Sequence, residues 1–175
     1  MGADLRAGVA GHGRAGARLS TAESLLVPQM RPMRESDLDF VLEIERSSFS
    51  TPWSRTSFRN LLGRNDAHLW VALTDGEIVG YVVVWHVLRE AELGNLAVAR
   101  SRRRLGLGQR LLDWALAEAG GRGAERVFLE VRESNETAHR LYERRGFRPV
   151  GRRRRYYRAP VEDARVMCLE LVGLE

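Results

Sequence analysis

The sequence predicts a single domain of the α/β (α+β) class, and three observations support this prediction. At 175 residues, 44% of them hydrophobic, the chain can bury a sizeable core in one domain. From Met30 onward, apolar residues recur alternately with the period of a helix and the period of a strand. The pair Asp75-Gly76 between two β-rich runs indicates a hairpin, so part of the sheet is antiparallel.

Two helices are predicted ahead of the sheet. The first is capped by Ser36 or Asp37, carries its apolar residues on one face and ends near Ser47. The second is shorter: it begins after Pro52-Trp53-Ser54 and closes at Gly63.

Three strands and a long helix come next. The strands cover residues 69–73, 78–87 and 91–98, and the Asp-Gly turn joins the first two. A basic loop then leads into a helix from Gly106 to about Ala119, which has one apolar side. The glycine-rich segment 120–123 ends that helix.

The last third of the chain predicts a strand, a helix and a closing pair of strands. Residues 126–132 form a short apolar strand, after which Ser134 or Asn135 caps a helix that a glycine ends. Two antiparallel strands follow, at 147–157 and 164–171, joined by a loop that contains a proline.

The domain organisation follows from where this periodicity starts. Residues 1–29 are expected to be a disordered N-terminal extension, because they are rich in small residues and show no lasting period. Residues 30–175 are predicted to form the single domain.

Composition limits the class of protein. The net charge is +5 and every basic residue is Arg, which we interpret as coding bias rather than as a demand for phosphate or RNA contacts. The lone Cys168 cannot join an intramolecular disulfide and indicates a reducing, cytoplasmic setting. No apolar run approaches the length of about 18 residues that spans a membrane, and no signal peptide is visible. The four histidines lack metal spacing, so no metal is predicted.

A strand, a basic loop, two glycines and a helix follow one another over Leu93–Gln109. The N–H groups of a helix start attract an anion, and Gly106 and Gly108 let a ligand approach the backbone. The dinucleotide fingerprint and the P-loop both require residues that are missing here. We therefore predict that this segment binds the phosphates of a cofactor; a solvated Arg cluster at a bare helix start is the alternative.

The pattern Arg-x-x-Gly-x-Gly at 103–108, after that strand, resembles the signature of the GCN5-related N-acetyltransferases. Within this family the chain is similar to the RimI type, bacterial enzymes that act on the N-terminal alanine of a small-subunit ribosomal protein. The matching segments are 51–54, 95–98 with the glycine loop, 129–135, 141–143 with Gly146-Phe147, and 154–157 followed by 162–164 and Met167. The resemblance covers about Met30 to the C-terminus.

The resemblance implies a fold and a co-substrate. The fold is a mixed, mostly antiparallel sheet of about six to seven strands with a splayed parallel pair, flanked by about four helices. Acetyl-CoA would lay its acetyl-pantetheine arm along Leu96–Val98 like an extra strand and its pyrophosphate on the glycine loop, and Asn135 would hold it from the next helix. The residues implied in cofactor binding are Leu96, Ala97, Val98, Arg103, Arg104, Leu105, Gly106, Leu107, Gly108, Gln109 and Asn135.

The same resemblance implies two catalytic residues. An α-amino group has a pKa of about 8 and must lose its proton to attack a thioester, so a base is needed. Glu130 is the implied base, because an apolar strand raises a carboxylate's pKa towards that role; a strand-end Glu paired with Arg is the alternative. Tyr142 is the implied acid for the leaving thiolate; the alternative is that Tyr142 only packs in the core. The N–H of Val98 could polarise the thioester carbonyl.

The implied function is direct transfer of acetyl to the N-terminal amine of a protein. Acetylation of a Lys side chain or a small amine by the same fold is one alternative. An Arg-rich RNA-binding or ribosome-binding module without catalysis is another, because Arg152–Arg155 precede Tyr156 and Tyr157. The loops at 50–53 and 156–163 are expected to frame the acceptor. Neither a membrane nor a nucleic acid is predicted as a partner.

Overall fold

The computed structural model describes residues 27–171. The predicted N-terminal extension therefore lies outside the described residues, apart from its last three positions. Gln29 already belongs to the first strand, one residue before the expected start of the domain at Met30. Within 27–171, no helix is both long and apolar enough to cross a membrane.

Apart from β1 and two short 3-10 helices, labelled η1 and η2, the helices and strands follow the predicted order. From the N-terminal end of the described chain they are β1 (Gln29–Pro32), η1 (Glu35–Asp37), α2 (Leu38–Ser48), α3 (Arg55–Leu62), β2 (Ala67–Thr74), β3 (Glu77–Val87), β4 (Glu90–Val98), η2 (Arg100–Arg102), α4 (Leu107–Gly121), β5 (Arg126–Arg132), α5 (Glu136–Arg144), β6 (Arg148–Arg158) and β7 (Val161–Glu170).

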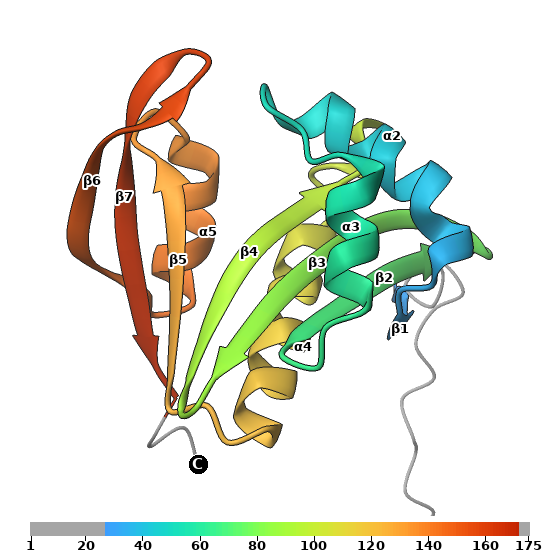
Figure 1. Ribbon diagram of the computed structural model, residues 1–175, viewed down its shortest axis with the longest axis horizontal. Helices are drawn as coiled ribbons and strands as arrows, with labels where there is room; N and C mark the ends of the chain where they lie inside the picture. The colour runs from blue at the N-terminus through green and yellow to red at the C-terminus, as the bar shows by residue number, and fades with distance from the viewer. Residues whose placement is uncertain (1–26, 172–175) are drawn as a thin grey trace, which may run out of the picture.

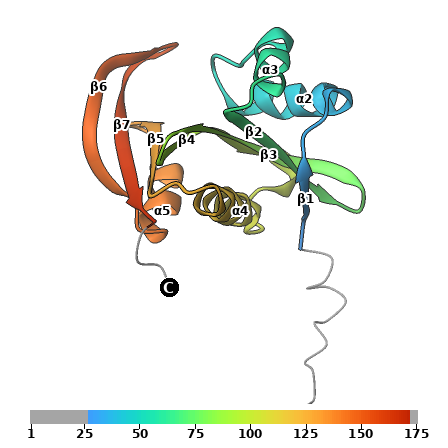
Figure 2. The same cartoon turned by 60° about the horizontal axis from the view of Figure 1, so that its bottom comes forward.

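Seven strands form one sheet in the order β1-β2-β3-β4-β5-β7-β6. Neighbouring strands are antiparallel, except that β4 and β5 are parallel with α4 as their crossover. Helices α4 and α5 cover one face of the sheet, and α2 and α3 cover the other (Figures 1 and 2). This arrangement confirms the predicted class and the predicted mixed sheet.

Each face of the sheet has its own hydrophobic core. One cluster of buried residues packs under α4 and includes Leu111, Leu129 and Val131. The other packs under α2 and α3 and includes Phe58. Because side chains alternate along a strand, Glu130 of β5 points to the face opposite its neighbours Leu129 and Val131.

The sheet opens between β4 and β5. Leu93 and Asn95 have partners on β3, while Gly94 between them is an extra residue, that is, a β-bulge. The pairing of β4 with β5 stops at the same point, since its last pair joins Leu93 to Leu129. Beyond this pair the two strands diverge (Figure 1), which confirms the splayed parallel pair. We call the opening the slot.

Asp37 corrects one local prediction. Its side chain does not cap helix α2. Instead, the carboxylate accepts the N–H of Arg34 at 2.7 Å and two hydrogen bonds from Arg31, at 2.7 and 2.9 Å. The hydrogen bonds from Arg31 hold the pKa of Asp37 below its ordinary value. Instead of capping α2, Asp37 thus forms an ion pair that ties β1 to η1, directly before α2.

Two further elements differ from the sequence prediction. Strand β1 was not predicted, because it has four residues and ends in Pro32. Strand β7 starts at Val161 rather than Ala164, since a tight turn at 159–160 joins it to β6 where a longer loop was expected.

Candidate active site

The slot exposes one backbone edge of β4. Ala99 donates its N–H to the carbonyl of Val79 on β3 at 2.8 Å, and backbone groups of successive strand residues point to alternate edges. The N–H and C=O of Val98 therefore face the slot, where Arg103 Nε donates to the Val98 carbonyl at 3.0 Å. Leu96–Val98, predicted to bind the acetyl arm, lie beyond the last parallel pair, so β5 leaves this edge free for an added strand.

The loop between β4 and α4 presents backbone N–H groups. Arg104 and Gly106 have left-handed φ angles of 64° and 78°, a geometry that turns N–H groups into an anion-binding concavity. Gly106 caps α4 without a side-chain hydrogen bond, and the bond from Arg110 N–H to the Gly106 carbonyl begins the helix. The N–H groups of residues 107–109 have no partner within the helix. This arrangement suits a pyrophosphate.

The side chains of this loop have different surroundings. Besides its bond to Val98, Arg103 donates to Ser48 Oγ at 2.9 Å, so it braces the loop against the end of α2. Leu107 is buried and can offer a ligand only its backbone. The other predicted cofactor residues with side chains at this helix start, Arg104, Leu105 and Gln109, are exposed, as is Arg103 itself.

Gly108 and Asn135 lie at the starts of two helices, Gly108 in the first turn of α4 and Asn135 at the N-cap of α5. A Cβ at Gly108 would meet Leu141 and Val98 only at ordinary contact distances, 3.8 and 4.0 Å, so packing within the chain does not demand glycine there. Asn135 caps α5 by accepting the N–H of Ala138 at 3.1 Å through Oδ1. Its Nδ2 is left to donate to a cofactor.

A cavity of about 260 Å³ lies by β3, β4 and β5, on the face of α2 and α3. Its side chains combine two aromatic rings with three carboxylates and a guanidinium: Trp85, Phe128, Glu90, Glu92, Glu130 and Arg153. Glu90 pairs with Arg126, whereas Glu92 forms no ion pair with a described residue. Burial, together with the charge of Glu130, raises the pKa of Glu92. The cavity suits an amine-bearing acceptor.

Glu130 is not in the apolar setting that the sequence suggested. Its carboxylate pairs with Arg153 Nε at 2.5 Å and is only 13% exposed. The hydroxyl of Tyr156 also bonds to this carboxylate, which raises the pKa of Tyr156 to about 12. Both partners of Glu130, Arg153 and Tyr156, lie on β6. This strand is not a neighbour of β5 in the sheet, because β7 lies between them. The Arg-paired carboxylate considered from the sequence is therefore present, and it faces the cavity.

Tyr142 lies on the other face of the sheet. It is half-buried on α5 against the α4-side core, with its ring 5.6 Å from that of Phe147. Burial and then the neighbouring Tyr157 raise the pKa of Tyr142 above its ordinary value. The structure does not bring Tyr142 and Glu130 into contact; it places them on opposite faces of the sheet, beside β5.

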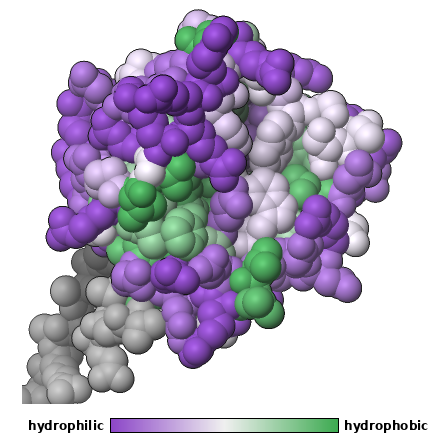
Figure 3. All heavy atoms as spheres, turned by 60° about the vertical axis from the view of Figure 1, so that its left-hand side comes forward, coloured by the Kyte–Doolittle hydropathy of each residue, from purple (hydrophilic) through white to green (hydrophobic). Residues whose placement is uncertain are grey.

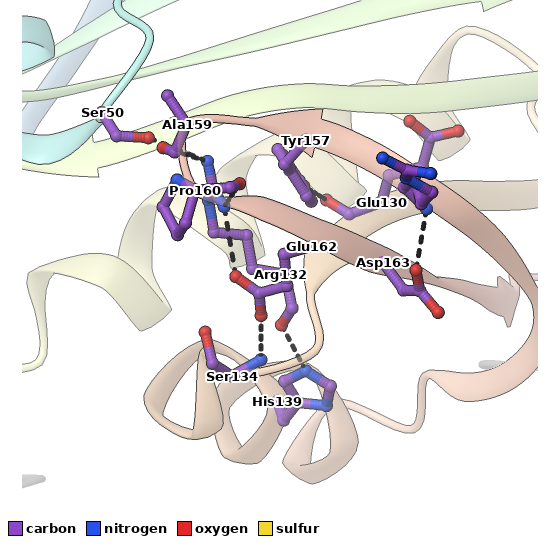
Figure 4. A network of polar contacts seen from close by, with 11 residues as sticks. Ser50, Glu130, Arg132, Ser134, His139, Tyr157, Ala159, Pro160, Glu162 and Asp163 are labelled. Atoms are coloured by element: carbon purple, nitrogen blue, oxygen red, sulfur yellow. Dashed lines mark hydrogen bonds and ion pairs between the residues drawn. The ribbon is translucent and has the colours of Figure 1, made fainter.

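Arg132 joins the two loops that were expected to frame the acceptor. It donates to Ser50 Oγ at 2.8 Å and to the carbonyl of Ala159 at 3.1 Å (Figure 4). It also pairs with Glu162 at 3.1 Å and lies over the ring of Tyr157 at 4.1 Å. Segments from three distant parts of the sequence thus meet at one guanidinium, above the end of β5.

Sequence reasoning missed several residues of this site. Arg132, Arg153, Glu92 and Trp85 received no individual role, because their partners come from elements far away in the sequence. The alternation along 91–98 could have placed Glu92 on the outer face of its strand. No local signal marks the other three.

Comparison with known proteins identifies the class of protein. Residues 38–147 match the model of the acetyltransferase (GNAT) family. The chain belongs to this family, and the protein is therefore an N-acetyltransferase by class.

Bacterial relatives narrow the comparison. A protein of Bacillus subtilis (strain 168), provisionally named a ribosomal protein bS18-alanine N-acetyltransferase, is 40% identical over 143 residues, covering 81% of this chain and 95% of the relative. The Escherichia coli (strain K12) enzyme of that name is 36% identical over 142 residues, covering 79% and 95%. The crystal structure of the Escherichia coli enzyme superposes with a TM-score of 0.76 at 32% identity, covering 82% of this chain and 93% of that chain.

A plant structure shares the fold. Arabidopsis thaliana NAA60 in complex with acetyl-CoA has a TM-score of 0.75 at 24% identity, covering 83% of this chain and 99% of that chain.

Gly108→Val should separate ligand binding from folding. Because valine and glycine have similarly poor helix propensities, we expect unliganded stability to stay within about 1 kcal/mol. The added methyl groups would crowd the free N–H groups of α4, so the affinity for CoA measured by calorimetry should fall at least about tenfold. Gly121→Ala, at the far end of the same helix in open space, is the matched control. Unchanged affinity in Gly108→Val would place the phosphates elsewhere.

Proposed function

We propose that the protein transfers the acetyl group of acetyl-CoA directly to the N-terminal amine of a protein, with an N-terminal alanine of a small-subunit ribosomal protein as the acceptor. The observation that carries the proposal is the slot. On one face of the sheet it lies beside the glycine loop, and on the other beside the acidic and aromatic cavity. Family membership and the names of the two bacterial relatives support the same reaction.

The donor fits the loop and the free edge of β4. The N–H groups of residues 107–109 would hold the pyrophosphate, and Leu96–Val98 would pair with the pantetheine arm. This places the thioester in the slot, where the N–H of Val98 can donate to the carbonyl oxygen as negative charge develops on it. Asn135 Nδ2 would hold the donor from α5.

Glu130 is the proposed base for the acceptor amine. The amine enters from the cavity and loses its proton to the Glu130 carboxylate, directly or through a water, and its nitrogen attacks the carbonyl carbon. Arg153 and Tyr156 hold the carboxylate at the cavity wall. Approach of a cationic amine would compete with Arg153 for that carboxylate.

Tyr142 is the proposed acid for the leaving group. When the tetrahedral intermediate collapses, the carbon–sulfur bond breaks and the sulfur takes the phenolic proton, so CoA leaves as a thiol. The nitrogen loses its second proton to water, and water returns a proton to Tyr142. Because the pKa of Tyr142 is raised, the phenol still holds its proton in mildly alkaline solution. Acid and base on opposite faces suit a reaction whose two substrates enter from opposite faces.

The ion pairs of β6 weaken the case for an RNA-binding module. Arg152 pairs with Asp163 at 3.0 Å and Arg153 with Glu130, so half of the run Arg152–Arg155 is neutralised by carboxylates of the same domain. These pairs leave less free positive charge on β6 than the sequence suggested. The face turned forward in Figure 3 is mixed in hydropathy, with hydrophobic residues among the hydrophilic ones.

A peptide assay tests the proposal. Purified protein with acetyl-CoA and a peptide that begins with alanine should release CoA and add one acetyl group to the α-nitrogen, which tandem mass spectrometry locates. The same peptide with a blocked N-terminus and an internal Lys is the control. Acetylation confined to Lys or to small amines would defeat the acceptor assignment. Unchanged melting temperature with excess acetyl-CoA would instead favour a binding module without turnover.

Glu130→Gln should lower turnover at neutral pH by about 10²-fold or more, since the amide cannot take the proton. CoA affinity should change little, because Glu130 faces the acceptor side of the sheet. Glu35→Gln removes a carboxylate that is paired with Arg59 at 2.7 Å and does not line the cavity, and its turnover should stay near that of the wild type. Full activity in Glu130→Gln would refute the base assignment.

Tyr142→Phe keeps the packing against Phe147 and removes the proton, so kcat should fall by about tenfold or more with little change in melting temperature. The wild-type rate should not decline between about pH 7 and pH 9, because a raised phenol pKa moves loss of the acid to higher pH. A pH–rate profile of both proteins checks this. If the variant matches the wild type across that range, Tyr142 only packs.

A further inference from the structure

Glu45 is a buried carboxylate that the proposed reaction does not use. It lies on α2 with 0% of its surface exposed. It forms no ion pair with any residue in 27–171. Its oxygens accept three kinds of hydrogen bond: from the backbone N–H of Trp53 at 2.7 Å, from the hydroxyl of Tyr81, and from Asn95 Nδ2 at 3.2 and 3.3 Å.

Such a group is expensive to keep in a core. Burial raises the pKa of Glu45, although its three donors oppose the shift. An apolar side chain of similar size would avoid the desolvation cost, whereas a fully satisfied polar network fixes one geometry of the parts that it joins. The identity of those parts therefore indicates what the carboxylate is for.

One partner belongs to the acceptor side. Trp53 follows Pro52 in the loop between α2 and α3, which the sequence predicted to frame the acceptor. Its ring lies 5.7 Å from the ring of Trp85, which lines the cavity. The hydrogen bond from the Trp53 N–H to Glu45 thus fixes the position of the α2–α3 loop relative to the cavity.

Another partner belongs to the donor side. Asn95 comes directly after the bulge at Gly94, where β4 parts from β5, and directly before the free edge at 96–98. The bulge changes the alternation of β4, which is why the Asn95 side chain reaches Glu45 on the α2 face. Trp85 covers the same bulge so closely that a Cβ on Gly94 would overlap its ring.

These contacts form a closed network. The bulge leads to Asn95, Asn95 bonds to Glu45, Glu45 accepts from Trp53, and the ring of Trp53 lies against Trp85, which covers the bulge. Tyr81 on β3, itself fully buried, supports it from below.

We propose that Glu45 is a positioning residue for acetyl transfer, whose carboxylate holds the acceptor loop at Trp53 in register with the β4 bulge that opens the donor slot. The inference rests on the proposed function. The amine and the thioester bind to different elements, and Glu45 is bonded to the acceptor loop and to the strand of the donor edge. Loss of its carboxylate should therefore weaken binding of the acceptor. Donor binding should persist, because it uses backbone groups of β4 and α4.

Glu45→Gln is the first test, because its amide group would face three donors with one oxygen fewer to offer. We expect KM for the acceptor peptide to rise about tenfold and kcat to fall, with KM for acetyl-CoA within about twofold of the wild type. Ile44→Val is the matched control: it loosens the adjacent buried position of α2 and lowers the melting temperature without moving either KM.

A swap gives the rescue. When Glu45→Gln is combined with Asn95→Asp, the amide introduced on α2 can accept from Trp53 and donate to the carboxylate introduced on β4. Acceptor KM should then return to within about threefold of the wild type. Tyr81→Phe removes one donor and keeps the ring, and it should raise acceptor KM more mildly; it serves if Glu45→Gln does not fold. A change in stability alone, or equal changes in both KM values, would overturn the positioning role.

Hydrogen exchange separates this inference from the proposed function. Without substrate, amides at 49–54 should exchange faster in Glu45→Gln than in Ile44→Val, and core strands should not differ between them. If the wild type fails to acetylate the peptide, the proposed function is refuted, while this measurement still tests whether Glu45 positions the acceptor loop. If exchange at 49–54 is alike in both variants, the positioning role of Glu45 is refuted whatever the activity.

Discussion

The parting of β4 and β5 after one short stretch of parallel pairing is the constraint on which the site depends. Separating two central strands exposes backbone groups that a sheet would otherwise pair, and such groups need partners. The bulge at Gly94 makes the separation possible by bending β4, and the Trp85 ring seals it from one side. What remains is an edge at 96–98 suited to a ligand that pairs as a strand does.

The two faces of the sheet divide the chemical tasks. On the α4 side, glycines and free helix N–H groups favour phosphate, while on the α2 side carboxylates and indoles favour an amine. In the proposed reaction neither substrate would have to pass the other, and CoA would leave without disturbing the acceptor loops. In this proposal the acid and the base are held by different elements, so the alignment of those elements would come from packing and from buried polar contacts such as those of Glu45.

The arginines illustrate how the charge of a sequence differs from the charge of a fold. All basic residues are Arg, and the run in β6 resembles a nucleic-acid surface when read as a string. In the folded chain Arg152 and Arg153 face carboxylates of β7 and β5, and Arg132 gathers loops around itself. The planar guanidinium, with its five donors, is suited to such joining, so these arginines act first as structural connectors.

The sequence by itself determined the order and type of most elements, the glycine loop and the family, because helical and strand periods, caps and turns are local properties. It missed β1, which is too short to show a period, and it offered Asp37 as a possible cap of a helix although Asp37 pairs with Arg31 of β1. Only the tertiary structure decided that Arg153 pairs with Glu130, that Tyr142 lies across the sheet from it, and that Glu45 is buried among donors. Each of these depends on which segments meet, and contacts between remote segments leave no periodic trace in a single sequence.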